Sequence, residues 1–305
     1  MERKDLEIIK LKSDIFTGKI KEYITLLFFF GEIIVFTFIG LYYSGVEVNI
    51  FNKPVETKVA VLHINKPITD RLSDEVYKAV EKVRADASFK ELVIKMNSPG
   101  GSPSASQEIA EYLKSVNKEL PVTMYIDEIA ASGGYYIASA IKPIIANKNA
   151  IIGSIGVVMP HYDASKLAET LGIKENTLTA GEFKQPFSLL KKMTKTNESY
   201  IKNNLLLPAY ANFLDDVAEN RGMKKESLLA YAEGKVFIAG DDKVQNILID
   251  KISNFFKVKE DLKRKYGDDL IFVTINKKIT SNRFFTIFAD PIIEMLKSEF
   301  RVKLH

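Results

Sequence analysis

The sequence predicts a mainly parallel α/β domain that follows one long apolar helix. Apolar runs of strand length alternate with helical patterns through the middle of the chain, and glycine-rich turns lie between them. Nearer the N-terminus, Tyr23 to Tyr43 is a stretch of 21 residues with a single charged side chain. In a parallel α/β domain the functional residues lie on loops at the strand ends, so the glycine turns are the first places to look for a site.

The expected elements follow from the spacing of apolar residues. Strands are predicted at Val59–Ile64, Leu92–Met96, Val122–Ile126, Ile144–Asn147 and Gly156–Met159. Helices are predicted at Ser73–Arg84, Ser104–Val116, Ser132–Ile141 and Ala164–Leu171. Beyond them we expect a long helix over Asn197–Glu219 that is kinked or broken ahead of Pro208, with shorter helices at Lys225–Ala232 and Gly240–Gln245. The C-terminal part consists of a charged linker over Lys257–Asp269, a strand over Leu270–Ile275 and an amphipathic segment over Phe284–Phe300.

The apolar segment Tyr23–Tyr43 has the length of a membrane span. At 1.5 Å per residue, its 21 residues extend about 31 Å as a helix, which matches a bilayer core. Tyrosines at both ends suit the two interfaces. Glu32 is the one charged residue, and a carboxylate near the bilayer centre costs a few kcal/mol, about 3 on insertion scales. A buried core helix is the alternative interpretation.

The basic residues around this segment predict its orientation. Six lie before it, and two lie in the twenty residues after it. They are Arg3, Lys4, Lys10, Lys12, Lys19 and Lys21 before the span, and Lys53 and Lys58 after it. This asymmetry puts the N-terminus in the cytoplasm and everything after Ser44 outside. The expected protein is a single-pass protein of the cytoplasmic (inner) membrane with an uncleaved anchor and its folded domain on the periplasmic side.

The predicted domain organisation has five parts. Residues 1–22 form a cytoplasmic segment, 23–43 the anchor, 44–54 a linker, 55–256 the α/β domain, and 257–305 a C-terminal extension.

Composition narrows the function classes. A net charge of +4 without a basic aromatic stripe argues against nucleic-acid binding. The absence of cysteine excludes disulfides and a cysteine nucleophile, and three scattered histidines argue against a metal site.

One serine stands out because of its small neighbours. Ser132 lies in Ala130–Tyr136, which reads Ala-Ala-Ser-Gly-Gly-Tyr-Tyr. Small residues let the backbone turn tightly and let a substrate approach the hydroxyl closely. Gly133, at the start of the following helix, would offer its amide N–H to a developing oxyanion. The alternative is a strand-to-helix joint without chemistry.

Three further segments belong with Ser132. Asn97–Gly101 reads Asn-Ser-Pro-Gly-Gly between an apolar strand and a helix, so its amides are expected to face the same pocket. Gly153–Val158 is a second small-residue turn and contains Ser154. In Ala180–Lys184, Lys184 stands between an aromatic residue and a Gln-Pro pair.

Together these segments resemble the serine/lysine peptidases of the signal peptide peptidase A family, including the SohB proteins, over about Val55 to Ile252. The resemblance implies a ClpP/crotonase-like fold. It also implies that Ser132 is the nucleophile, that Lys184 is the general base and that Ser154 hydrogen-bonds the lysine. Gly100 and Gly133 are then the glycines of the oxyanion hole. Two segments depart from the family pattern: Gln185-Pro186-Phe187 follows the lysine, and Asn246 to Asp250 keeps the aspartate of a Gly-Leu-Val-Asp pattern but lacks its glycine.

The chemistry of a serine nucleophile agrees with a lysine base. The hydroxyl must lose its proton as it attacks, so an acceptor has to lie within about 3 Å. His63 falls in a strand, His161 in a turn, and His305 is the last residue, so each is interpreted as structural or peripheral. A lysine can act as the base only if its ammonium is desolvated, which Phe183 and Phe187 would favour.

The leading hypothesis is a membrane-anchored serine endopeptidase that degrades cleaved signal peptides or other short apolar peptides through an acyl-enzyme. No cofactor is expected. The resemblance also implies a homo-oligomeric ring of about four or eight subunits. Two alternatives stay open: a non-catalytic membrane-anchored scaffold that binds peptides, and a crotonase-like acyl-CoA enzyme, which would need neither the anchor nor Lys184.

Overall fold

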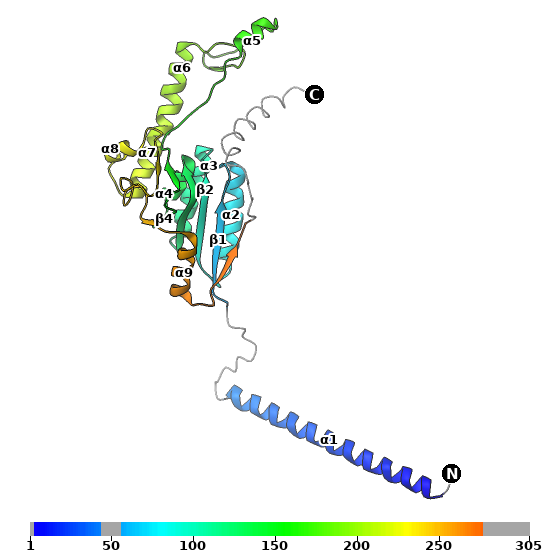
Figure 1. Cartoon of the computed structure of the whole chain (residues 1–305). Helices are drawn as coiled ribbons and strands as arrows, with labels where there is room; N and C mark the ends of the chain where they lie inside the picture. The colour runs from blue at the N-terminus through cyan, green and yellow to red at the C-terminus, as the bar shows by residue number, and fades with distance from the viewer. Residues whose placement is uncertain (1–2, 44–55, 277–305) are drawn as a thin grey trace. The chain divides into compact units, whose positions relative to one another are not determined.

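Residues 3–43 and 56–276 are described by the computed structural model, and the chain divides into two units, Met1–Val55 and Glu56–His305. Within residues 56–276 eight strands form one sheet (Figure 1). Its main path runs in the order β6-β5-β3-β2-β1-β8. Outside this path, β4 pairs with both β3 and β7. All of the pairs are parallel except β5 with β6. The strands are β1 Lys58–Ile64, β2 Phe89–Ser98, β3 Val122–Ala131, β4 Ile144–Ala146, β5 Ile151–Gly153, β6 Val236–Ile238, β7 Lys251–Ile252 and β8 Ile271–Thr274.

The three central strands are buried on both faces, which explains why they are continuous apolar runs in the sequence. Because successive side chains point to opposite faces, neighbouring residues belong to different cores. Ile94 and Met124 lie in the larger core, whereas Val93 and Tyr125 lie in the smaller one. The register places Ile94 opposite Met124, so residues of one face stand side by side.

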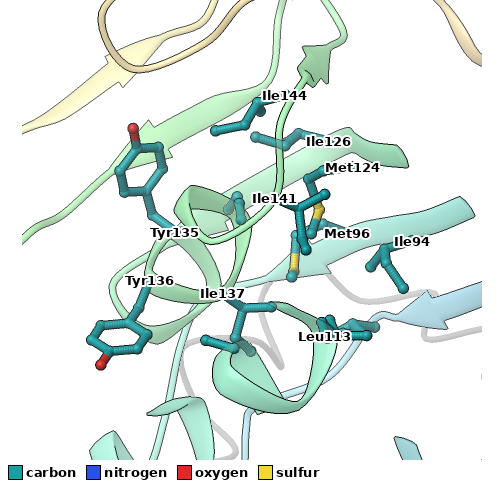
Figure 2. Close-up of a cluster of buried hydrophobic side chains, with 14 of the residues drawn as sticks. Ile94, Met96, Leu113, Met124, Ile126, Tyr135, Tyr136, Ile137, Ile141 and Ile144 are labelled. Carbon is teal, nitrogen blue, oxygen red and sulfur yellow. The ribbon is translucent and has the colours of Figure 1, made fainter. Parts of the chain in front are cut away.

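Helices α2 Asp70–Arg84, α3 Pro103–Val116 and α4 Gly133–Ser139 contribute their apolar faces to the larger core. Thr69 and Ser102 begin α2 and α3 by accepting hydrogen bonds from Leu72 N–H and Ala105 N–H. Figure 2 shows the core beneath α4, where Ile137 and Ile141 lie near the sheet residues Met96 and Met124. The start of α4 is therefore held by packing as well as by its own hydrogen bonds.

After β5 the chain leaves the sheet. Residues 157–206, here called the arm, contain α5 Ser165–Thr170, α6 Lys195–Ile201 and a π-helical stretch Lys202–Leu206. The chain returns through α7 Leu207–Arg221, whose Phe213 packs on Tyr136 of α4 with ring centroids 5.2 Å apart. No break occurs ahead of Pro208: the helix changes to a π-helical stretch over Lys202–Leu206 and continues as α7. In Figure 1, α5 and the far end of α6 lie well away from the sheet, whereas α7 lies beside α4.

Several sequence predictions are wrong in the second half of the chain. No strand forms over Gly156–Met159, because β5 ends at Gly153. Gly240–Gln245 is a series of turns, and Lys257–Asp269 is mostly helical, as part of α9 Phe255–Tyr266. Val258 and Leu262 of α9 lie four residues apart and join the smaller core. The remaining helices are α8 Lys225–Leu228 and the 3-10 turn Leu229–Tyr231, and the segment Phe284–Phe300 lies outside the described residues.

The first unit is described by the helix α1 Arg3–Tyr43, which contains the whole apolar segment Tyr23–Tyr43. Large apolar side chains on it are exposed, among them Leu27 and Phe28. In the part of the chain that the structure describes, no helix combines enough length with enough apolar character to cross a membrane.

A partly buried ion pair links α7 to the segment before β7. The Arg221 side chain is 3% exposed and forms two hydrogen bonds with the Asp250 carboxylate, of 2.7 and 3.1 Å. Asp250 also accepts the Ile144 N–H at 2.7 Å. Burial raises the pKa of Asp250, but the hydrogen bonds from Arg221 and Ile144 outweigh it and leave that pKa lowered. The aspartate retained from the family pattern is therefore a structural residue.

Asp250→Asn is expected to lower the free energy of unfolding by about 2–4 kcal/mol at neutral pH, because Arg221 would keep a buried, uncompensated charge. A lowered carboxyl pKa contributes stability that is present above the unfolded pKa of about 4 and lost as the pH falls through the folded value. Chemical denaturation should therefore show that the difference in free energy of unfolding between the wild type and Asp250→Asn becomes smaller in acid. Asp261→Asn, at an exposed ion pair, is the matched control and should change stability less. If this difference in free energy of unfolding stays constant through the acid range, the ion pair of Asp250 with Arg221 does not contribute the expected stability.

Candidate functional site

Three loops meet at the carboxyl ends of adjacent parallel strands. The ladder pairs Ser98 of β2 with Ala130 of β3, and Ala131 of β3 with Gly153 of β5. The Ser132 N–H continues it by donating to the Gly153 carbonyl at 2.9 Å. The turn after β2, the serine after β3 and the serine after β5 are therefore brought together, at the end of the sheet where parallel α/β domains place their sites.

Ser132 has an unusual backbone conformation. It has φ 51° and ψ −124° and immediately precedes α4, and its carbonyl accepts the Tyr136 N–H at 2.9 Å. A non-glycine residue at positive φ is strained by about 1–3 kcal/mol and persists only where its surroundings hold it. Within the described residues its half-buried hydroxyl has no hydrogen-bond partner. A sharp strand-to-helix turn of this kind presents a serine hydroxyl outward.

Two of the glycines predicted to line the site pack directly on this turn. Gly100 has φ +104°, and a Cβ built on it would lie 2.7 Å from Ser132 Cβ and 2.8 Å from Gly133 N. A Cβ on Gly133 would collide with the hydroxyl of Ser106 on α3. Glycine is thus required at position 100 so that the turn after β2 can touch the start of α4, and at position 133 so that α4 can pack on α3.

The hydrogen bonds of the glycine turn determine which amides remain available. The Gly100 N–H donates to Ser98 Oγ at 3.2 Å, and the Gly100 carbonyl accepts the Ile68 N–H at 2.9 Å. In a trans peptide the N–H opposes the carbonyl, so the Gly101 N–H points away from Ile68, toward the β3 side of the turn where Ser132 lies. Among the described residues this N–H has no backbone acceptor. The Gly133 N–H lies in the first turn of α4, where amides lack intrahelical acceptors.

Ser154 occupies the matching position after β5. It has φ 54°, is half-buried, and its N–H donates to the Lys235 carbonyl at 2.6 Å. This bond extends the antiparallel pairing of β5 with β6. Ser154 therefore directly follows β5, the strand that pairs with β3, and Ser132 lies at the end of β3.

Lys184 is not brought to this group. It lies in the segment between α5 and α6, which Figure 1 shows at the far end of the arm from α4. Its side chain is exposed, and within the described residues its amine has no ion pair or hydrogen bond. The two phenylalanines expected to cover it pack elsewhere: Phe183 stacks on Tyr200 at 4.2 Å, and Phe187 lies 5.8 Å from the His161 ring.

The Glu175 carboxylate organises the segment that carries Lys184. It accepts hydrogen bonds from Ser188, from Thr177 at 2.7 Å and from Gln185 at 3.0 Å. The Ser188 and Thr177 hydroxyls are the main reason that the pKa of Glu175 is lowered. Gln185, which departs from the family pattern, therefore has a structural role in this loop.

The remaining candidates lie outside this group. His63 is in β1, with its backbone N–H bonded to the Asn276 side chain, and His161 is in the arm. His305 is beyond the described residues. In residues 3–43 and 56–276 no group of three or more histidine, aspartate or glutamate side chains is arranged to hold a metal ion. Sequence reasoning overlooked Ser98 and Gly101, although both belong to the Asn-Ser-Pro-Gly-Gly motif.

Comparison with known proteins gives consistent matches. The profile of peptidase family S49 matches residues 114–267, half of the chain, and the profile of the Clp protease family matches residues 48–157. A protein named as a candidate protease in Methanocaldococcus jannaschii is 32% identical over 57% of this chain and 55% of its own length. Protease 4 of Haemophilus influenzae is 32% identical over 66% of this chain and 34% of its own. The chloroplastic serine protease SPPA of Arabidopsis thaliana is 28% identical over 71% and 31%. The chain thus spans about half or less of the length of these relatives.

Gly100→Ala is expected to slow the labelling of Ser132 by a fluorophosphonate, which reacts with activated serines, by about 100-fold or more. The new methyl group would lie 2.7 Å from Ser132 Cβ and would force the turn away from α4. Gly222→Ala is the matched control: it has φ +68°, but its Cβ would meet only Lys142 Nζ at 3.8 Å. It should cost about 1–2 kcal/mol of stability and leave the labelling rate unchanged. Equal labelling of both variants would show that the close approach of Gly100 is not needed.

Proposed function

Because the chain belongs to peptidase family S49, we propose that it is a serine peptidase whose nucleophile is Ser132. One observation carries the proposal: the Ser132 hydroxyl, on a strained turn, lies between the glycine turn after β2 and Ser154 after β5. The Gly101 and Gly133 N–H groups beside it have no backbone acceptor in the described residues, so they are available to donate to a carbonyl oxygen.

In the proposed reaction Ser132 Oγ attacks the scissile carbonyl carbon while the neutral Lys184 amine takes the hydroxyl proton. Negative charge develops on the carbonyl oxygen. The Gly133 N–H and a second amide from the glycine turn stabilise it, and each such donor is worth about 100-fold or more in rate. We assign the second amide to Gly101 instead of Gly100, because the Gly100 N–H already donates to Ser98. The lysine then protonates the leaving amine, and a water that it deprotonates hydrolyses the acyl-enzyme.

The proposal requires Lys184 and Ser154 to meet at Ser132, and we propose that the lysine comes from a second copy of the chain. Two features support this. Lys184 is carried by the arm, away from α4 (Figure 1). The arm also exposes large apolar side chains, including Val158 at 85% and Leu178 at 100%. Such residues are typical of surfaces that another protein covers. A closed homo-oligomer, a ring of about four or eight subunits, would supply each site with a neighbour's arm.

We further propose that residues 23–43 anchor the protein in the cytoplasmic membrane. Residues 1–22 would lie in the cytoplasm, 44–54 would form a linker, and the peptidase domain 55–256 with its extension 257–305 would lie on the periplasmic side. The excess of basic residues before the span supports this orientation. The exposed apolar side chains of α1 are those that lipid would cover. A site tethered near the bilayer suits cleaved signal peptides and other short apolar peptides as substrates.

Fluorophosphonate labelling tests the Ser/Lys pair. The wild type should be labelled, Ser132→Ala should not be labelled, and Lys184→Ala should be labelled at least about 100-fold more slowly, because proton transfer typically contributes that much. Lys192→Ala removes another exposed lysine of the arm and should behave as the wild type. The labelling rate should rise toward alkaline pH, where an amine is more often neutral. Absence of labelling in every protein would favour the non-catalytic scaffold or the acyl-CoA enzyme instead.

The same two variants distinguish a lysine in cis from one in trans. Alone, Ser132→Ala should not be labelled and Lys184→Ala should be labelled only slowly. If the lysine comes from another copy, co-assembly of the two would pair an intact serine with an intact lysine in up to about a quarter of the sites. If both residues act within one chain, no mixed site is complete and the mixture stays unlabelled, which would contradict the trans arrangement.

The anchor is tested by fractionation of cells that make the full chain. We expect the protein to stay in the membrane pellet after an alkaline carbonate wash, because the apolar span is held by lipid rather than by charge. Ile33→Lys together with Ile34→Lys would place two further charges next to Glu32, at a cost of about 5–7 kcal/mol on insertion scales, and should release the protein. Release of the wild type by carbonate would contradict the anchor.

A further inference from the structure

Ser98 is a buried serine that the proposed reaction does not use. It is the last residue of β2 and is 0% exposed. Its hydroxyl donates to the Lys66 carbonyl at 2.8 Å, and the same oxygen accepts the Gly100 N–H at 3.2 Å. A single side chain thus links the loop after β1 to the glycine turn after β2.

Ser98 also contacts the helix that follows Ser132. A Cβ added to Gly134 would lie 2.7 Å from the Ser98 carbonyl oxygen and 3.5 Å from its Cβ. The residue therefore touches the loop after β1, the glycine turn and the first turn of α4. The segments that shape the proposed oxyanion hole therefore meet at this residue.

The glycine turn needs such a restraint. Gly100 has φ +104° and Gly101 has φ +155°, and two adjacent glycines have many other conformations of similar energy. Two hydrogen bonds hold Gly100 on opposite sides: its N–H is bound by Ser98 Oγ, and its carbonyl by the Ile68 N–H. The first bond holds the peptide unit before Gly100, and the second holds the unit between Gly100 and Gly101. With the units on both sides of the Gly100 Cα restrained, the direction of the Gly101 N–H is set.

We propose that Ser98 is a positioning residue that fixes the glycine turn so that the Gly101 amide faces the oxyanion formed at Ser132. This role rests on the proposed peptidase function. The side chain has to be small, has to donate to a carbonyl and has to accept from an amide. Alanine meets the first requirement alone, and aspartate when ionised cannot donate. Serine meets all three.

Ser98→Ala removes both hydrogen bonds with little change of shape. We expect kcat for a peptide substrate to fall about 10- to 100-fold while KM stays within about twofold, because an oxyanion contact strengthens in the transition state. The affinity for a peptide aldehyde, which forms an oxyanion adduct with a catalytic serine, should weaken by about the same factor. Ser139→Ala is the matched control, since Ser139 is 0% exposed and its hydroxyl also makes two hydrogen bonds, to the Tyr136 carbonyl and from Asn220. Ser139→Ala should lower the melting temperature. The ratio of its dissociation constant for the aldehyde to its KM should stay at the wild-type value.

Amide hydrogen exchange separates this proposal from the peptidase function. In a Ser132→Ala background, which carries out no reaction, Ser98→Ala should speed exchange at Gly100 at least about tenfold and Ser139→Ala should not. Unchanged exchange at Gly100 would overturn the positioning role whatever the activity. Faster exchange together with an inactive wild type would instead refute the peptidase function and leave the restraint on the turn standing. Equal losses of kcat and aldehyde affinity in Ser98→Ala and Ser139→Ala would also overturn the proposal, because they would point to a general loss of stability.

Discussion

The candidate site depends on the parallel hydrogen-bond ladder that joins β3 to β2 on one side and to β5 on the other. This ladder pairs Ser98 with Ala130 and Ala131 with Gly153, so three loops that are distant in sequence end side by side. A shift of one residue in either register would send Ser132 to the other face of the sheet. The register is strongly specified because both faces are buried: Met124 belongs to the larger core and Tyr125 to the smaller one.

The ladder also supports backbone strain at its end. Ser132 and Ser154 both have positive φ without being glycine, and each would relax if its surroundings allowed it. They are held by backbone hydrogen bonds, from Ser132 N–H to Gly153 and from Ser154 N–H to Lys235. Tyr135 and Ile137, fully buried just beyond Ser132, fix the start of α4 (Figure 2). The core beneath α4 is therefore what keeps the serine turn in its strained shape.

Local sequence patterns predicted the parts of the fold that are determined locally. The central strands are long apolar runs, and α3 has apolar residues at helical spacing, so the sequence predicts both. Strands β6 and β7 have only two or three residues, which is too short for the sequence to show a periodicity. The sequence predicts a linker in place of α9, because the two buried residues of this helix stand among many charged ones. In the site, the motif around Ser132 identified the turn. The acceptor of the Gly100 N–H could not be inferred, because it depends on the orientation of one buried hydroxyl.

The division of the proposed site between sheet and arm follows from what each group needs. An oxyanion hole works only if its donors are held to within about 0.5 Å, which a sheet end closed by buried glycines can provide. A lysine reaches its partner through a long flexible side chain, so it tolerates delivery on a separate arm. It must, however, lose contact with water to act as a base. Lys184 is exposed in the single chain. In the proposed assembly the apolar side chains of the arm would exclude that water, so the contact that brings the amine to Ser132 would also create the environment in which it can accept a proton.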